Sequence, residues 1–329
     1  MEEVLEKYVG RLAPSPTGAL HIGNVRTFMV AWLRARSSGG RILMRMEDLD
    51  HPRDKPGAAA QAIDDLRWLG FDWDGASVQS ERRDVYHDAI ESLRGRGLAY
   101  PCVCSRSDVE AAQSAPHDGE QLFYPGTCRG RFATWDDAQR FLDARVDGGR
   151  RRLPCWRFFV ERGTKVRFND AFAGEFSQDV SAALGDFPLA RDADGAGYTL
   201  AATVDDVLAG VTEVVRGDDL LGATPAQILV ARALFGDAAR ISYCHVPLVV
   251  GADGCRLAKR HGDTRIASYR AAGFRPQTII GRLAASCGWC EAGEEMSLAE
   301  LVPRFSLDTI PHRPYFCENF FTQIADNML

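Results

Sequence analysis

The amino-acid sequence predicts an α/β fold built on a doubly wound parallel sheet. Residues 8–13 form a short apolar run typical of a buried strand, and Pro14 and Pro16 break this run into a tight loop. Apolar residues then recur with helical spacing over 24–35. A second apolar run at 41–46 ends in acidic residues, and the carboxyl ends of parallel strands border the crevice where such sheets bind ligands.

The elements that follow are predicted from the same periodicities. Helices are expected over 57–69 and 81–95, because each segment has apolar residues on one side. Residues 155–160 and 165–169 are expected to form an antiparallel hairpin, since a Gly-containing loop joins them. The later elements are a strand that starts at residue 213 and leads into a charged loop and a helix, a last strand at 242–250, and helices at 281–289 and 297–305.

The opening strand–loop–helix unit is also a candidate binding site. This order of elements directs backbone N–H groups and the positive end of a helix to one spot, where a phosphate could bind. His21 stands at the start of the helix and could donate a hydrogen bond to charge that develops on such a phosphate. However, this unit opens many α/β folds and a single His is often structural, so the unit alone leaves both interpretations open.

Bulk properties narrow the class of protein. The chain has 329 residues, a net charge of −6 and nine cysteines. Its length suits one catalytic domain with insertions or a small appendage. The negative net charge predicts that the surface as a whole is not basic, so a nucleic acid would have to bind to a local basic face of the protein. Without a signal peptide or long apolar segment, we expect a cytoplasmic protein with no membrane contact and with free or metal-bound thiols.

Three cysteines are grouped like metal ligands. Cys102 and Cys104 form a close pair, and Cys128 follows after an insertion. This spacing is compatible with a zinc site or with unrelated thiols. His117 and Tyr124 lie in the insertion as possible fourth ligands. Residue chemistry favours His117, because imidazole is the commoner zinc ligand and a phenol must lose a proton with an ordinary pKa of about 10.

The most specific motif is the run Ala-Pro-Ser-Pro-Thr-Gly-x-Leu-His-Ile-Gly-Asn, which ends at Asn24. It resembles the N-terminal signature of the class I glutamyl-tRNA synthetases, whose His-Ile-Gly-His motif would begin here at His21. The resemblance implies that His21, Gly23 and Asn24 bind ATP. It also implies that Arg11 and Ser15 hold glutamate.

Three further positions extend this resemblance. Glu47 would contact the ammonium group of glutamate, and Tyr198 would offer a hydroxyl group. Arg216 would grip the side-chain carboxylate with two N–H groups, which selects an acid over an amide. Outside the resemblance, these residues would be a solvated acid, a core Tyr and a surface Arg. Arg45 and Arg53 could balance the charge of Glu47.

A Gly-containing basic loop follows the last predicted strand. It stands where the family has its Lys-Met-Ser-Lys-Ser loop, with Lys259 at the second lysine, Arg256 at the first and Ala258 at the serine. Positive charge is therefore kept beside the expected ATP site. The resemblance implies that Lys259 and His21 stabilise the charge of the phosphates during the reaction, with Mg²⁺ accompanying ATP.

Other positions resemble the glutamyl-queuosine branch of the family. There the metal site reads Cys-x-Cys…Tyr-x-x-x-Cys, which implies one structural zinc per chain and Tyr124, in place of His117, as the fourth ligand. Ala202 also fits this branch, because glutamyl-tRNA synthetases proper carry Asn there. The chain stops soon after Arg313, where those enzymes continue into a helical anticodon-binding region.

The resemblance therefore implies ATP-dependent activation of L-glutamate without tRNA, followed by transfer to the queuosine base at position 34 of tRNA(Asp). One alternative is a short glutamyl-tRNA synthetase that charges the tRNA 3′ end. Another is a catalytically silent tRNA-binding paralogue. We expect the protein to be a monomer.

The expected domain organisation follows the family. Residues 1–100 would form the first half of a Rossmann-type nucleotide-binding domain, and 191–262 would form its second half with the altered basic loop. Residues 101–190 would hold the zinc-containing insertion and a subdomain that binds the acceptor end of tRNA. Residues 263–329 would form a helical region that contacts the tRNA stem, and no anticodon-binding domain is expected.

Overall fold

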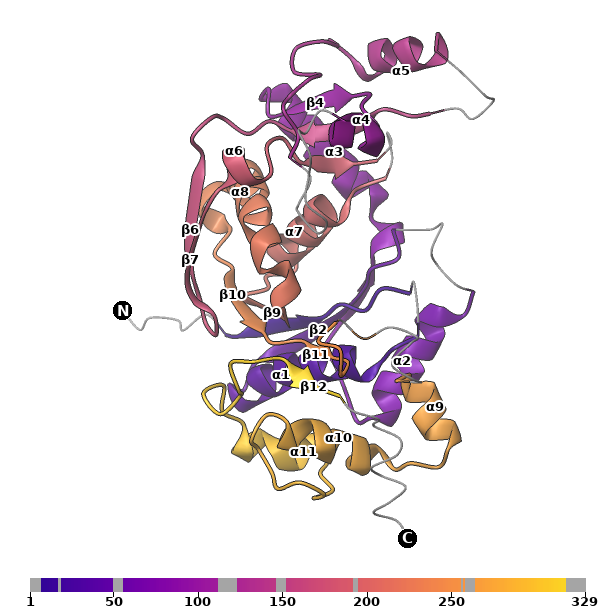
Figure 1. The fold of residues 1–329 in the computed structure, drawn as a ribbon, viewed down its shortest axis with the longest axis vertical. Coiled ribbons are helices and arrows are strands. Elements are labelled where there is room, and N and C mark those ends of the chain that lie inside the picture. The colour runs from indigo at the N-terminus through magenta and orange to yellow at the C-terminus, as the bar shows by residue number, and fades with distance from the viewer. Residues whose placement is uncertain are drawn as a thin grey trace.

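The computed structural model describes residues 7–16, 19–49, 56–111, 123–145, 152–191, 195–255, 257 and 264–317. Its centre is formed by parallel strands with helices packed above and below them (Figure 1). Within these ranges, no helix combines the length and apolar character that a membrane span requires.

The first half of the central layer is a three-stranded parallel sheet. It contains β1 (Val9–Leu12), β2 (Arg41–Met46) and β3 (Ala76–Val78), with β2 in the middle. The helices α1 (Ile22–Ser37) and α2 (Ala58–Trp68) connect these strands in turn. The strands and helices predicted for this part of the chain are therefore confirmed.

The second half is built from β9 and β10, which pair in parallel. The helix α7 (Tyr198–Leu208) precedes β9 (Glu213–Gly217). The turn η3 (Asp218–Ala223) and the helix α8 (Thr224–Phe235) then lead to β10 (Ser242–Val246). This order confirms the predicted strand, charged loop and helix.

The two halves meet where β9 lies beside β1. The Thr212 N–H donates to the Val9 carbonyl at 2.9 Å, and the Val9 N–H donates to the Thr212 hydroxyl at 3.0 Å. The carboxyl ends of all these strands consequently face the same side. This arrangement confirms the predicted Rossmann-type, doubly wound parallel fold.

The predicted hairpin between 155–160 and 165–169 is wrong, because the two strands belong to different sheets. The strand β5 (Cys155–Phe158) pairs with strands before and after it, whereas β6 (Lys165–Asp170) pairs with β7 (Gly174–Asp179) and lies beside β10. Glycines with positive φ occur at both connections, at Gly163 before β6 and at Gly174, the first residue of β7. The local turn signal therefore did not distinguish the two possible partners of β6.

The remaining elements lie at the two ends of the molecule (Figure 1). The three-stranded antiparallel sheet with β5 at its centre, between β4 (Ala99–Cys102) and β8 (Pro188–Ala190), belongs to the end that carries the predicted metal ligands. The other elements that precede β10 are η2 (Gln79–Glu81), α3 (Arg83–Gly95), α4 (Arg106–Ala111), α5 (Trp135–Asp143), α6 (Val180–Ala183) and η4 (Gly236–Ala238).

The C-terminal part is helical, as predicted, but its elements are shifted. The helix expected at 281–289 is α10 (Pro276–Ala285), which begins with a proline at its first position. The helix expected at 297–305 is only α11 (Leu298–Leu301), because Pro303 removes a backbone donor and the chain continues as a short 3₁₀ turn. The other elements are β11 (Val249–Val250), α9 (Ile266–Ala271), η6 (Val302–Arg304) and β12 (Tyr315–Phe316), which pairs with β11.

A buried carboxylate, Glu213, reinforces the joint between the two halves. It accepts a hydrogen bond from the Tyr8 hydroxyl at 2.9 Å and pairs with Nε and Nη2 of Arg34 on α1. Burial and the Glu213 charge raise the pKa of Tyr8, so its hydroxyl stays a donor. The carboxylate thus links β9 to α1 and to the residue that precedes β1.

We predict that Glu213→Ala lowers the free energy of unfolding by about 3 kcal/mol, because it leaves a partly buried guanidinium and a buried hydroxyl without their acceptor. Urea denaturation would measure this loss. The matched control is Glu91→Ala, which removes a carboxylate from an exposed pair with Arg94 and should leave the midpoint unchanged. Equal midpoints for the two variants would contradict the role given to Glu213.

Candidate active site

One cavity lies at the carboxyl ends of β1 and β9 and has a volume of about 620 Å³. It collects residues from β1, the loop after it, the start of α1, the loop after β2, α7 and β9. Every residue of the described ranges that was predicted to bind ATP or glutamate lines it: Arg11, Ser15, His21, Gly23, Asn24, Glu47, Tyr198 and Arg216.

Several residues named in the sequence analysis lie outside the described ranges. They are Arg53, His117, Arg256, Ala258 and Lys259.

His21 is the N-cap of α1. Its Nδ1 accepts hydrogen bonds from the N–H groups of Gly23 at 3.2 Å and Asn24 at 3.4 Å. The expectation that these N–H groups are available to a phosphate is therefore wrong, since the imidazole already takes them. Because Nδ1 is an acceptor, a neutral ring carries its proton on Nε2.

Four charged side chains, three buried and Glu47 partly buried, form a balanced network beneath the cavity. Arg45 donates to Glu47 at 2.9 Å and to Asp206 at the end of α7. Arg11 donates to the Val215 carbonyl at 2.7 Å, and its Nε lies 3.4 Å from Asp206. The expectation that Arg45 balances the charge of Glu47 is confirmed. Burial raises the pKa of the Glu47 carboxyl, and the adjacent Arg45 charge opposes this shift.

Arg216 is almost fully buried at the far wall of the cavity. Its three nitrogens donate to His245 at 3.0 Å, to Tyr198 at 3.2 Å and to Thr224 at 2.8 Å. Tyr198 starts α7 and leaves 41% of its surface exposed at the cavity edge. These contacts place both residues at the crevice, unlike the core Tyr and surface Arg that would be expected without the resemblance.

Sequence reasoning did not identify several residues that hold this site together, namely Asp170, Asp206, Thr224 and His245. None of them belongs to a recognisable motif. Asp206 follows another Asp at the end of a predicted segment, and this pair of acids was the one available signal.

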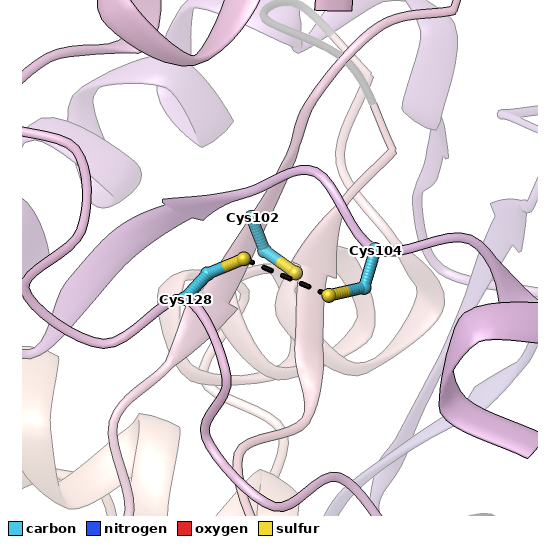
Figure 2. A group of neighbouring side chains, drawn as sticks. All are labelled: Cys102, Cys104 and Cys128. Carbon is cyan, nitrogen blue, oxygen red and sulfur yellow. Dashed lines mark hydrogen bonds between the residues drawn. The ribbon is translucent and has the colours of Figure 1, made fainter. Parts of the chain in front are cut away.

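The three predicted cysteine ligands converge at the other end of the molecule, and Figure 2 shows their sulfur atoms pointing toward one another. The three Sγ atoms lie within 4.8 Å of one another, and Cys104 and Cys128 are 3.6 Å apart. Ligand sulfurs in a tetrahedral zinc site with bonds of about 2.3 Å are about 3.8 Å apart. The spacing of these thiols therefore fits a single metal ion.

Tyr124 completes this group. Its hydroxyl oxygen lies 3.3 Å from Cys102 Sγ and 3.6 Å from Cys104 Sγ, and it accepts the Cys128 N–H at 2.9 Å. The Arg157 guanidinium donates to Cys102 at 3.2 Å and its carbon lies 3.7 Å from the centre of the Tyr124 ring. The phenol oxygen and three sulfurs thus surround one position, with a positive charge beside them.

Burial and mutual contact raise the pKa values of the side chains in this group. The hydrogen bond with Cys102, together with burial, raises the pKa of Cys128 to about 12. Burial and the neighbouring thiols also raise the pKa of Tyr124. Protons or a bound cation must therefore neutralise the cluster. None of the nine cysteines of the chain is in a disulfide in the structure.

Comparison with known proteins shows the family of the chain. A family model described as tRNA synthetases class I (E and Q), catalytic domain, matches residues 7–316. The glutamyl-Q tRNA(Asp) synthetase of Symbiobacterium thermophilum is 45% identical over 93% of this chain and 94% of its own length. The glutamyl-Q tRNA(Asp) synthetase of Rhodopirellula baltica is 42% identical over 96% of this chain and 98% of its own length.

Relatives of a second kind are glutamate–tRNA ligases. Glutamate–tRNA ligase 1 of Halorhodospira halophila is 40% identical over 92% of this chain and 64% of its own length. The crystal structure of a glutamate tRNA ligase from Elizabethkingia meningosepticum, in complex with its amino acid, is 25% identical with a TM-score of 0.77, and the match covers 98% of this chain and 70% of that one. The chain therefore belongs to the class I tRNA synthetases of the glutamate and glutamine type.

Proposed function

We propose that this protein activates L-glutamate with ATP, without tRNA, and transfers the glutamyl group to the queuosine base at position 34 of tRNA(Asp). One observation carries the proposal: a single cavity is lined by every described residue that the family resemblance assigns to glutamate or ATP. The names of the relatives with 45% and 42% identity support the choice of acceptor.

Arg216 is the proposed ligand of the glutamate side chain. Arginine has five N–H groups, and three of those on Arg216 are used by Tyr198, Thr224 and His245. Two N–H groups, one on each terminal nitrogen, are left for a carboxylate. An amide would present its own N–H hydrogens to these donors, so glutamate is favoured over glutamine.

Glutamate would be oriented by charges at its other end. Glu47 is held by Arg45 and would attract the ammonium group, while Arg11 and Ser15 would hold the rest of the amino acid. In the first step an oxygen of the α-carboxylate attacks the α-phosphorus of ATP, and the bond to the β-phosphate breaks to release pyrophosphate. His21 and the positive end of α1 would stabilise the added charge at the α-phosphate.

The second step needs no separate nucleophile on the protein. A hydroxyl oxygen of the queuosine cyclopentene ring attacks the acyl carbon of the adenylate, AMP leaves and the hydroxyl proton is released to solvent. Lys259 is proposed to contribute positive charge at the phosphates, and Mg²⁺, which the family uses with ATP, would neutralise part of the same charge.

The cysteine group is proposed to hold one structural zinc through Cys102, Cys104, Tyr124 and Cys128. Four protein ligands would fill a tetrahedral shell and leave no position for a reacting molecule. The zinc would supply binding energy that orders the surrounding insertion, within the segment 101–190 that we assign to contact with tRNA.

A glutamyl-tRNA synthetase that charges the tRNA 3′ end is the second candidate, because glutamate–tRNA ligase 1 of Halorhodospira halophila is 40% identical to this chain. Both candidates share the activation step. They differ in the atom that receives the glutamyl group.

We predict that the purified protein catalyses ATP–pyrophosphate exchange with glutamate in the absence of tRNA. Radiolabelled glutamate should then appear on tRNA(Asp) that contains queuosine, and removal of the 3′-terminal adenosine of the tRNA should leave this transfer intact. Label on the 3′ end of unmodified tRNA(Glu) would establish the second candidate. No exchange with glutamate would instead indicate a silent tRNA-binding paralogue.

We predict that Arg216→Gln raises KM for glutamate about 100-fold in the exchange assay, because the carboxylate loses a charged, two-pronged partner worth about 3 kcal/mol. KM for ATP should change little. Arg94→Gln, which alters an exposed arginine on α3, is the matched control. An Arg216→Gln enzyme with the normal KM for glutamate would remove Arg216 from the site.

We predict that the protein contains one zinc per chain, measured by mass spectrometry of the metal. Cys128→Ser and Tyr124→Phe should each weaken zinc retention and lower the melting temperature, since each removes a ligand atom. Cys255→Ser changes an exposed cysteine and serves as the control. Loss of zinc in His117→Ala, with normal zinc in Tyr124→Phe, would show that His117 is the fourth ligand.

A further inference from the structure

A buried chain of hydrogen bonds leads from Asp170 through His245 to Arg216. Asp170 ends β6 and His245 lies in β10, and these strands are neighbours in Figure 1. The carboxylate Oδ2 of Asp170 lies 2.6 Å from Nδ1 of His245, and the Nε of Arg216 donates to Nε2 of His245 at 3.0 Å. Both Asp170 and His245 have fully buried side chains.

The surroundings of Asp170 fix the direction of these hydrogen bonds. Its other oxygen, Oδ1, accepts the backbone N–H groups of Phe172, Ala173 and His245 at 2.8–3.0 Å. These donors and the ring N–H lower the pKa of Asp170 in spite of its burial, so Asp170 is a carboxylate and an acceptor only. His245 must therefore carry its proton on Nδ1, which leaves Nε2 with a lone pair toward Arg216.

This tautomer determines how Arg216 is held. The Nε–H of Arg216 meets the lone pair of His245, and Thr224 lies within 3.1 Å of the same ring nitrogen while it accepts from Nη2 of Arg216. Hydrogen bonds at Nε and at one terminal nitrogen prevent the guanidinium plane from turning about the Cδ–Nε bond. Its remaining donors then keep one direction, toward the cavity.

We infer that Asp170 and His245 are positioning residues, which hold the Arg216 guanidinium in the orientation that receives the glutamate carboxylate and so set the preference for glutamate over glutamine. This inference rests on the proposed function, since it concerns the same cavity. Neither residue lines the cavity itself, so their effect would pass through Arg216.

Asp170→Asn tests the inference with almost no change in volume. The amide oxygen can keep the three backbone N–H groups, which places the amide NH₂ opposite Nδ1 of His245. That nitrogen must then accept, so the ring proton moves to Nε2 and faces the Nε–H of Arg216. We expect KM for glutamate to rise about tenfold or more, the glutamate-to-glutamine ratio of kcat/KM to fall, and KM for ATP to stay within about twofold.

The matched control is Cys244→Ala. Cys244 neighbours His245 in β10, and its buried side chain packs in the core around α1, on the other face of the strand. Its kinetic constants should equal those of the wild type. If Asp170→Asn behaves like this control, or if KM for ATP and KM for glutamate rise equally, the positioning role is wrong.

A second measurement uses the wild-type protein and does not depend on activity. Nitrogen NMR of the histidine rings should show His245 as a neutral ring protonated at Nδ1, and the opposite tautomer would overturn the inference.

The proposed function and the positioning role fail in different ways. A wild-type protein without glutamate-dependent exchange disproves the function and the inference with it, whereas an active wild type with an unaltered Asp170→Asn variant disproves the inference alone.

Discussion

The contact between β1 and β9 is the constraint on which the site depends. Two hydrogen bonds between Val9 and Thr212 align these strands, and the Arg11 side chain spans them to reach the Val215 carbonyl. Residues from the two halves of the chain reach one cavity because their strands run in parallel and end together. A shift of one strand along the other would separate Arg11 from Arg216, although each would keep its own local structure.

The helix α7 carries much of the electrostatic organisation around this joint. Its first residue, Tyr198, contacts Arg216, and its last turn supplies two buried carboxylates. Asp206 pairs with Arg45, while Asp205 accepts hydrogen bonds from Gln79, Arg82 and Tyr86. Both carboxylates thereby have fixed partners before substrate arrives, which avoids the penalty of an unpaired buried anion and preorganises the cavity.

Features that depend on residues close together along the chain could be predicted from the sequence. Features that depend on the pairing of distant strands could not. The first strand–loop–helix unit and the cysteine pair were recognisable because their residues lie close together along the chain. The partner of β6 was not, since two Gly-containing turns offered equally good local signals. Asp170 and His245 are 75 positions apart and meet only because β6 lies beside β10, so no spacing pattern could have indicated them.

A contrast between two of the buried arginines, Arg45 and Arg216, supports the proposal that Arg216 binds substrate. Arg45 is neutralised by Glu47 and Asp206, so its charge is already satisfied within the protein. The three groups that Arg216 contacts are two hydroxyls and a neutral imidazole, none of which is an anion. Asp170 anchors the imidazole from its far side, so its charge helps to orient Arg216 without pairing with it. The positive charge of Arg216 consequently remains for a carboxylate that enters the cavity, and Ala202 in the neighbouring α7 supplies no polar side-chain atom that could share this role.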